Sequence, residues 1–160
     1  MEQIEIRVGT PEDVDDIMDL ALSACKENGF NNPSTRKLLE NIYAGCTLQQ
    51  GLVGICGKKG EPAEAVILLR IGQMWYSDDY VIEEKAIFVR PEFRGAKLGR
   101  ARMLCDFAKK VSDTIGLPLV IGVLSNHRTK GKIKLYERQF GEQSGAFFLY
   151  GATTGSYKGH

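Results

Sequence analysis

The chain has 160 residues and a mass of 17.7 kDa, which is the size of one ordinary domain. Apolar residues make up 43% and charged residues 26%, and such a composition excludes a chain that is disordered throughout. No apolar stretch approaches the ~18 residues of a membrane span, and no signal peptide is visible. Four scattered cysteines and only two histidines predict free thiols in the cytoplasm and no bound metal.

The net charge of +1 conceals an uneven distribution of charge along the chain. Residues 1–84 carry 7 basic and 15 acidic side chains, a net charge of −8, whereas residues 85–138 carry 13 basic and 4 acidic ones, a net charge of +9. Such asymmetry favours a polyanionic partner for the basic part, which could be a nucleic acid, a membrane surface or a phosphate-rich small molecule. The alternative is that the charges only keep the surface soluble.

The first 45 residues predict a strand and two helices. Residues 4–8 alternate between apolar and polar side chains, as in a half-buried strand. Residues 10–13, Thr-Pro-Glu-Asp, form a capping pattern, so we expect a helix that begins there and ends at Gly29. A second, shorter helix follows residues 33–34 and ends at Gly45.

Three strands come next in the prediction, over residues 52–56, 65–71 and 81–89. The first two are joined by a turn over residues 58–62, and residues 75–80 form the polar tip of the following hairpin. The third strand is apolar on both faces near its end, which is typical of a central strand.

The second half of the chain contains the strongest helical pattern, which begins shortly after Pro91 and ends at Gly116. Its apolar positions are Leu104, Phe107, Ala108, Val111 and Ile115. Residues 119–124 predict a buried strand, residues 132–139 a helix and residues 146–150 a final strand. The result is a mixed α/β (α+β) domain over residues 1–150, in the order β-α-α-β-β-β-α-β-α-β, with a tail over residues 151–160. We expect a central sheet of six to seven strands with helices on both faces.

The most informative segment comprises residues 87–100, where a buried strand ends, the chain turns at Gly95 and a helix begins at once. Such a turn presents unpaired backbone N–H groups and the positive end of a helix dipole to one point, which suits a phosphate or pyrophosphate. The neighbouring basic residues are Arg94, Lys97, Arg100 and Arg102. The alternative is that the glycine only separates a strand from a helix.

Two motifs carry a resemblance to a known family. Residues 89–99 follow the pattern Val-x-Pro-x-aromatic and then Arg/Gln-x-x-Gly-x-Gly/Ala, with Lys97 in place of the middle glycine. Residues 135–142 look like the segment Leu-Tyr-Glu-x-x-Gly-Phe, with its last pair inverted to Phe140-Gly141. In both motifs, and in the order of elements over residues 4–150, the chain resembles the GNAT superfamily of acetyl-CoA-dependent N-acetyltransferases.

The resemblance implies that acetyl-CoA binds as a cosubstrate beside the fourth strand. Backbone groups of Ile87, Phe88 and Val89 would bond to the pantetheine arm, and Asn126 would contact it as well. The residues that the resemblance assigns to the pyrophosphate are Arg94, Gly95, Ala96, Lys97, Leu98, Gly99 and Arg100.

The resemblance also implies two catalytic residues. Tyr136 would protonate the departing CoA thiolate, and the alternative is that it is a core tyrosine. A carboxylate on the fourth strand would take the proton of the amine, directly or through water. Regular alternation predicts that Glu83 shares its face with Ile87 and Val89, whereas Glu84 faces the other way. We favour Glu83 as the base, and the alternative is that it is a solvated surface charge.

The expected function is direct transfer of an acetyl group from acetyl-CoA to a primary amine of a small molecule or peptide. The resemblance implies that the acceptor site is built from the first two helices and the strand hairpins around residues 72–80. Acidic residues there, Asp78 and Asp79 among them, would favour a cationic amine. We expect no nucleic-acid or membrane partner, and a homodimer stays open. The alternative function is a non-catalytic CoA-binding or protein-interaction module on the same fold, which Lys97 and the inverted Phe140-Gly141 pair suggest.

Overall fold

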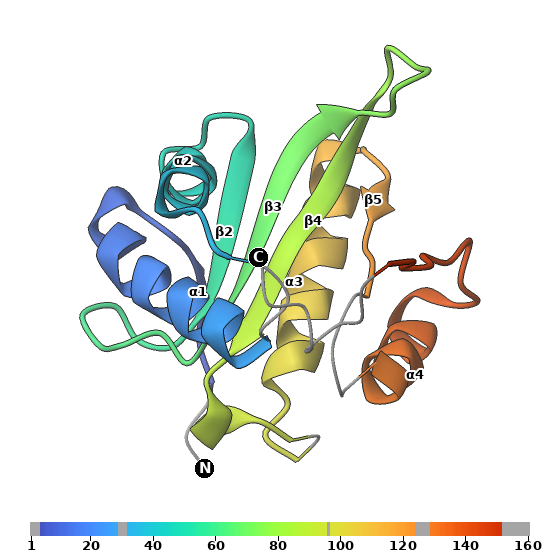
Figure 1. Ribbon diagram of the computed structural model, residues 1–160. Helices are drawn as coiled ribbons and strands as arrows, with labels where there is room; N and C mark the ends of the chain where they lie inside the picture. Colours follow the sequence, from blue (N-terminus) through green and yellow to red (C-terminus); the bar gives the residue numbers. More distant parts are fainter. Residues whose placement is uncertain (1–3, 29–31, 96, 124–128, 152–160) are drawn as a thin grey trace.

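The computed structural model describes residues 4–28, 32–95, 97–123 and 129–151 (Figure 1). The strands are β1 (Ile6–Val8), β2 (Gly51–Cys56), β3 (Ala65–Gln73), β4 (Tyr80–Val89) and β5 (Leu119–Val120). The α-helices are α1 (Val14–Asn28), α2 (Thr35–Cys46), α3 (Arg100–Ile115) and α4 (Thr129–Phe140). Two short 3-10 helices, η1 (Pro11–Asp13) and η2 (Pro91–Phe93), complete the described elements.

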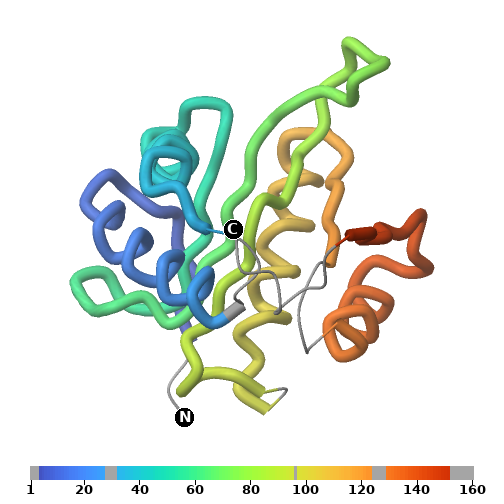
Figure 2. Tube along the Cα trace, in the orientation of Figure 1, coloured from blue at the N-terminus to red at the C-terminus, as the bar shows by residue number. Residues whose placement is uncertain are grey.

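The strands form one mixed sheet in the order β1-β2-β3-β4-β5, antiparallel except for the parallel pair of β4 and β5. The hairpin of β3 and β4 is the longest part of the sheet, and its tip projects beyond the other elements (Figure 2). β5 pairs with β4 only at Ile82–Leu119 and Glu83–Val120. Within the described residues, no strand continues this pairing along β4 from Glu84 to Val89.

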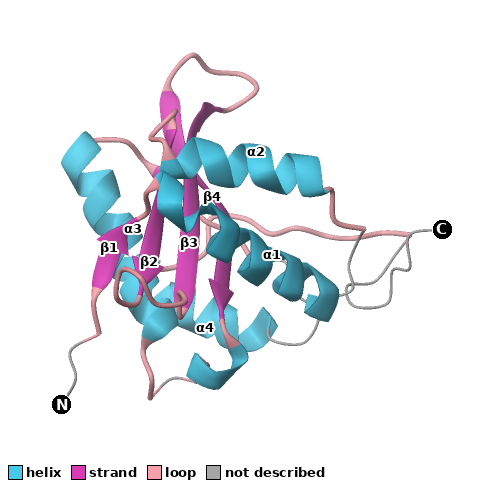
Figure 3. Cartoon of the chain, turned by 90° about the vertical axis from the view of Figure 1, so that its left-hand side faces the viewer, coloured by secondary structure: helices cyan, strands magenta, loops and turns pink. Residues whose placement is uncertain are grey.

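Helices cover both faces of the sheet, as the sequence predicts (Figure 3). α1 and α2 pack on one face around a core that includes Ile17, Ile42 and Val53. α3 packs on the other face around Ile67 and Leu104, and α4 lies beside α3. None of the described helices is long and apolar enough to cross a membrane.

Two glycines allow helices to approach the sheet closely. A Cβ atom on Gly45 would lie 2.6 Å from a methyl group of Val53 and 2.8 Å from one of Leu68. A Cβ atom on Gly54 would lie 2.6 Å from the ring of Phe107 on α3. The prediction that Gly45 ends α2 is wrong, because α2 continues to Cys46 and buries the glycine against β2. Its hydrogen side chain serves close packing rather than helix termination.

The sheet is smaller than predicted. The described part contains five strands rather than six to seven, because β5 ends at Val120 and residues 146–150 form no strand. β5 has too few paired residues to offer a long edge to a sixth strand. The prediction of a strand over residues 146–150 is wrong, and the side chains of these residues are mostly exposed.

The capping pattern at the start of the first helical segment is confirmed. The backbone N–H of Thr10 donates to the carboxylate of Asp13 at 2.8 Å, and Arg7 donates two further hydrogen bonds to that carboxylate at 2.9 and 2.8 Å. Both side chains are largely buried. The hydrogen bonds from Arg7 are the largest cause that lowers the pKa of Asp13 to about 2, so it is ionised at neutral pH.

Candidate active site

β4 contains a β-bulge at the point where β5 leaves it. In the ladder with β3, Glu84 pairs with Leu69 and Ala86 pairs with Leu68, so Lys85 has no partner residue on β3. An extra residue of this kind shifts the alternation of side chains by one position. The two ends of β4 therefore follow opposite alternation patterns.

The bulge changes which glutamate faces which helix. Glu83 pairs with Arg70 on the face that α1 and α2 cover, whereas Glu84 lies on the α3 face. Ile87 and Val89 also lie on the α3 face, where they pack against its core. The prediction that Glu83 shares its face with Ile87 and Val89 is wrong, because it assumes a strand without a bulge.

The connection between β4 and α3 leaves backbone donors free at the helix start. Gly95 and Gly99 both have positive φ, 120° and 67°, and Gly99 is the residue that precedes the helix. The amide of Met103 is bonded to the carbonyl of Gly99 at 3.0 Å, so the amides of residues 100–102 have no acceptor within α3. The first turn contains no acidic side chain, and no side chain caps it. This terminus can therefore accept an anion.

Two of the arginines assigned to the pyrophosphate pair with carboxylates of this chain. Arg94 donates to both carboxylate oxygens of Glu27 on α1, at 2.5 and 2.8 Å, and to the carbonyl of Val89 at 2.9 Å. Arg100 donates to one carboxylate oxygen of Glu64 through Nε at 3.1 Å and through Nη2. These contacts join the turn to α1 and to the segment before β3, and so hold its backbone in place.

Two other cations at this turn are not paired in this way. Lys97 and Arg102 form no ion pair with the described residues, and both are exposed. The guanidinium of Arg102 lies 3.3 Å from the position of a Cβ on Gly99, so it folds back over the start of α3. Leu98 is partly exposed on the same turn. Ala96, which the sequence analysis assigned to this site, lies outside the described residues.

Tyr136 lies on α4, which packs beside α3. The ammonium of Lys109 on α3 donates to the carbonyl of Gln139 at 3.2 Å, and the ring of Tyr136 contacts Phe140 edge to face at 5.8 Å. The hydroxyl of Tyr136 forms no hydrogen bond with the described residues. Burial raises its pKa well above the usual value, and the charge of Glu84 raises it further. Tyr136 is therefore protonated throughout the physiological pH range.

Glu84 and Cys105 belong to the same partly apolar region between β4, α3 and α4. Burial raises the pKa of Glu84 from 4.5 to about 7, although the positive charges of Lys132 and Lys85 oppose this. Burial also raises the pKa of the fully buried Cys105 thiol to about 12. A neutral buried thiol is a poor nucleophile, so this cysteine suits packing rather than acyl transfer.

The remaining predicted site residues are divided between the two faces of the sheet. Glu83 is partly exposed, and its carboxylate forms an ion pair with Lys85 at 2.8 Å. Phe88 packs against the core under α1 and α2, so neighbouring residues of β4 pack on alternate faces. Asn126 lies outside the described residues.

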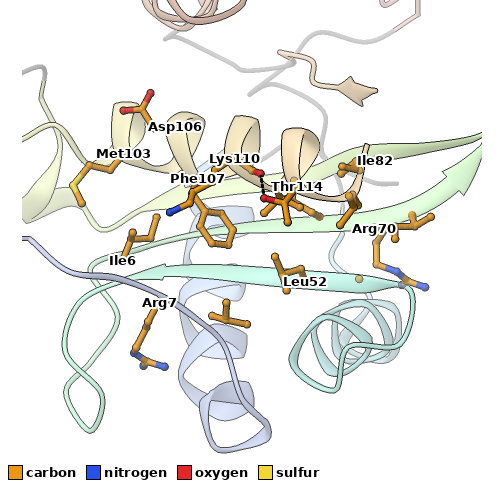
Figure 4. Close-up of a pocket in the computed structure, with 16 residues that line it drawn as sticks. Ile6, Arg7, Leu52, Arg70, Ile82, Met103, Asp106, Phe107, Lys110 and Thr114 are labelled. Carbon is orange, nitrogen blue, oxygen red and sulfur yellow. Dashed lines mark hydrogen bonds between the residues drawn. The ribbon is translucent and has the colours of Figure 1, made fainter. Parts of the chain in front are cut away.

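A separate groove of about 680 Å³ lies between α3 and strands β1 to β3 (Figure 4). Its lining is mainly apolar and includes Leu52 and Phe107, with Lys110 and Thr114 from α3. It contains neither the turn before α3 nor Tyr136, so it is not part of the candidate active site. The described residues contain no group of three or more His, Cys, Asp or Glu side chains that could hold a metal ion.

Several solved structures of acetyltransferases have a fold similar to that of this chain. A possible acetyltransferase from Clostridium difficile 630 superimposes with a TM-score of 0.69 at 16% identity, over 94% of this chain and 99% of that one. An aminoglycoside N-acetyltransferase in complex with CoA gives 0.68 at 16% identity, over 92% and 93%. A predicted acetyltransferase from Clostridium acetobutylicum with acetyl-CoA gives 0.70 at 12% identity, over 92% and 94%.

The chain therefore has the mixed α/β fold of the GNAT-type acetyltransferases. No family model matches the sequence, and no curated protein matches it. At identities this low, the similarity establishes the fold, and the chemistry has to be argued from the residues of this chain.

Proposed function

We propose that this protein is an N-acetyltransferase that moves an acetyl group from acetyl-CoA directly to a primary amine. The observation that carries the proposal is the open edge of β4 from Glu84 to Val89, which ends at a helix terminus with free amides. An extended chain with a phosphate at one end fits such an arrangement, because backbone groups can bond to the chain while the amides bind the phosphate. Proteins of this fold have been crystallised with CoA and with acetyl-CoA, which supports the same ligand here.

Bound acetyl-CoA would supply the activated thioester. The amides of residues 100–102, with Lys97 and Arg102, would hold its pyrophosphate, while Arg94 and Arg100 keep the turn in shape. Backbone groups of Ile87, Phe88 and Val89 would bond to the pantetheine arm. A backbone N–H of β4 near the bulge would stabilise the oxyanion that forms during transfer.

Tyr136 is the proposed proton donor to the departing thiolate. It keeps its proton at neutral pH, and its hydroxyl has no other partner within the described residues. Glu83 is the proposed base, because its carboxylate is partly exposed and an acceptor amine can therefore reach it. We propose a cationic acceptor, because Asp78 and Asp79 at the tip of the adjoining hairpin form no ion pair with the described residues.

The proposal is tested by calorimetric titration with acetyl-CoA and by assaying CoA release with a panel of cationic amines. The Gly99→Val variant should weaken binding at least about tenfold, because a branched side chain cannot easily adopt the positive φ of this residue. The Gly131→Val variant is a matched control on α4, in open space. It should bind acetyl-CoA as the wild type does.

Variants of the two proposed catalytic residues separate turnover from binding. Tyr136→Phe should keep its affinity for acetyl-CoA and lose about 10²-fold or more in kcat. Glu83→Gln should lower kcat with the same retention of affinity. Binding of acetyl-CoA without release of CoA with any amine would instead support a non-catalytic CoA-binding module. Absence of binding would refute both the acetyltransferase and the CoA-binding module.

A further inference from the structure

The groove between α3 and strands β1 to β3, which we call the α3 groove, contains none of the residues proposed to act in acetyl transfer (Figure 4). Its volume of about 680 Å³ lies within the range of roughly 300–1,000 Å³ that is usual for small-molecule sites. Such sites are mostly apolar, and a few polar groups orient the ligand. The side chains around the groove therefore indicate which ligand fits it.

The floor of the α3 groove is apolar and incompletely covered. Val8, Leu52 and Ile71 line it from three successive strands of the sheet. Val8 is 44% exposed, and the other two side chains are partly exposed, although α3 packs on this face of the sheet. An apolar ligand would remove this surface from water, and that burial favours binding.

The wall that α3 contributes is long enough for an extended ligand. Its lining residues run from Met103 to Ile115, which corresponds to roughly 18 Å at 1.5 Å per residue. An alkyl chain of about ten carbons is at most ~14 Å long, because a C–C bond measures ~1.5 Å. Such a chain fits along the groove beside the ring of Phe107.

The two arginines that line the α3 groove are bonded to other groups of the chain. Arg7 donates to both carboxylate oxygens of Asp13, at 2.9 and 2.8 Å. Arg70 donates to the side-chain oxygen of Asn41 on α2 at 2.9 Å and to the carbonyl of Gln50 at 3.3 Å. These contacts occupy both guanidinium groups, so we assign neither of them to a ligand.

Lys110 is the lining cation that is left for a ligand. It is exposed, and its ammonium forms no ion pair with the described residues. Asp106, the acidic residue of the lining, has the ammonium of Lys109 at 3.7 Å, which balances its charge. The hydroxyl of Thr114 donates to the carbonyl of Lys110 at 2.7 Å, so its proton is already used. An apolar groove with one such cation matches an aliphatic chain that carries one negative charge.

We propose that the α3 groove binds an aliphatic monocarboxylate of medium chain length. Its alkyl chain would lie against Leu52 and Phe107, and its carboxylate would pair with Lys110. A single carboxylate carries the one charge that Lys110 neutralises, whereas an aliphatic amine would be repelled by it. This inference does not depend on the proposed acetyltransferase activity.

The test is calorimetric titration of the full chain with decanoate. We expect saturation at one molecule per chain. Hexanoate should bind at least about 20-fold more weakly, because each missing methylene group lowers the affinity roughly threefold or more. Decyltrimethylammonium has the same alkyl chain and the opposite charge, and it should bind at least about tenfold more weakly than decanoate.

Two variants locate the binding site. Val8→Trp places a large ring in the groove and should weaken decanoate binding at least about tenfold. Lys110→Glu should weaken it at least about fivefold and abolish the preference for decanoate over decyltrimethylammonium. Lys110 is exposed, so Lys110→Glu should have the circular dichroism spectrum of the wild type, and it keeps the test valid if Val8→Trp does not fold.

The matched control is Lys37→Glu on α2, which packs on the opposite face of the sheet. Lys37 is exposed and forms no ion pair with the described residues, so this variant makes the same change of charge away from the groove. It should bind decanoate as the wild type does. The proposal would be overturned by the absence of saturable binding up to about 1 mM decanoate. Equal affinity for the cationic probe, or decanoate binding that Lys110→Glu leaves unchanged, would overturn it as well.

Discussion

Glu84 provides the sharpest test of the electrostatics of the candidate site. Burial raises its pKa from 4.5 to about 7 in the folded protein. A tenfold difference in proton affinity corresponds to about 1.4 kcal/mol, so ionised Glu84 should destabilise the fold by about 3 kcal/mol. A glutamine at this position would have nearly the same shape but no charge to bury. We therefore expect Glu84→Gln to be more stable than the wild type at alkaline pH.

The sign of the pH dependence follows from the raised pKa. Below about pH 4.5, Glu84 is protonated in both the folded and the unfolded chain, so its burial costs little. Between pH 4.5 and about 7, the unfolded chain releases this proton while the folded chain keeps it, so folding stability falls as the pH rises. Above about pH 7 the penalty is complete. The advantage of Glu84→Gln should thus grow from under 1 kcal/mol at pH 4.5 to about 3 kcal/mol at pH 8.5.

The measurement is the free energy of unfolding from urea titrations at both pH values. Glu83→Gln is the control, because it removes the same charge from the neighbouring residue on the opposite face. Glu83 is paired with Lys85 near the surface, so this variant should change stability by about 1 kcal/mol or less at both pH values. An advantage of Glu84→Gln that does not change with pH, or an equal rise for Glu83→Gln, would refute the reasoning.

Two further predictions concern stability. Asp13→Asn should lower the free energy of unfolding by about 2 kcal/mol at pH 7, because the pKa of Asp13 falls from 3.8 to about 2 on folding. This difference should shrink to about 0.5 kcal/mol as the pH falls from 4 to 2 in urea titrations, and an undiminished difference at pH 2 would contradict the assignment. Gly45→Ala should destabilise the protein by about 1–3 kcal/mol through overpacking against Val53. Gly131→Ala, in open space on α4, should instead stabilise it by up to ~1 kcal/mol. Thermal melts of both variants measure these effects, and equal effects would refute this account.

Local sequence signals predicted most of the fold. The capping pattern of residues 10–13 marked the start of the first helical segment, and Gly116, with a φ of 71°, ends α3 where expected. The turn at residues 94–99 was found in the same way, because glycines with positive φ leave a sequence signal. Such features depend on a few neighbouring residues, so the sequence contains the information needed to predict them.

The errors concern features that depend on distant residues. The bulge at Lys85 exists only in the pairing of β4 with β3, and nothing in the sequence of β4 marks it. Glycine is a residue type that often ends a helix, but Gly45 lies within α2, where close packing against Val53 and Leu68 requires a residue without a side chain. Residues 146–150 have a strand pattern but no partner strand among the described residues. Likewise, the raised pKa of Glu84 depends on burial beneath helices that lie far away in the sequence.

The division of charge along the sequence has a structural explanation within one chain. Three arginines at or after the end of β4 form ion pairs with carboxylates from the acidic half. The pairs are Arg90 with Asp16 at 2.8 Å, Arg94 with Glu27 at 2.5 Å, and Arg100 with Glu64. Two of these carboxylates lie on α1 and the third lies just before β3. Part of the opposite charge in the two halves therefore holds the turn against the rest of the domain.

This pairing narrows the kind of anion that the basic half can bind. A nucleic acid needs an extended surface of unpaired cations along its phosphates. Around the start of α3, however, Lys97 and Arg102 are the cations without an ion pair to the described residues, and the guanidinium of Arg102 lies over the start of the helix. These two cations add positive charge to the helix terminus with the free amides. A single phosphate or pyrophosphate group matches such a site in size and charge better than a polyanion does.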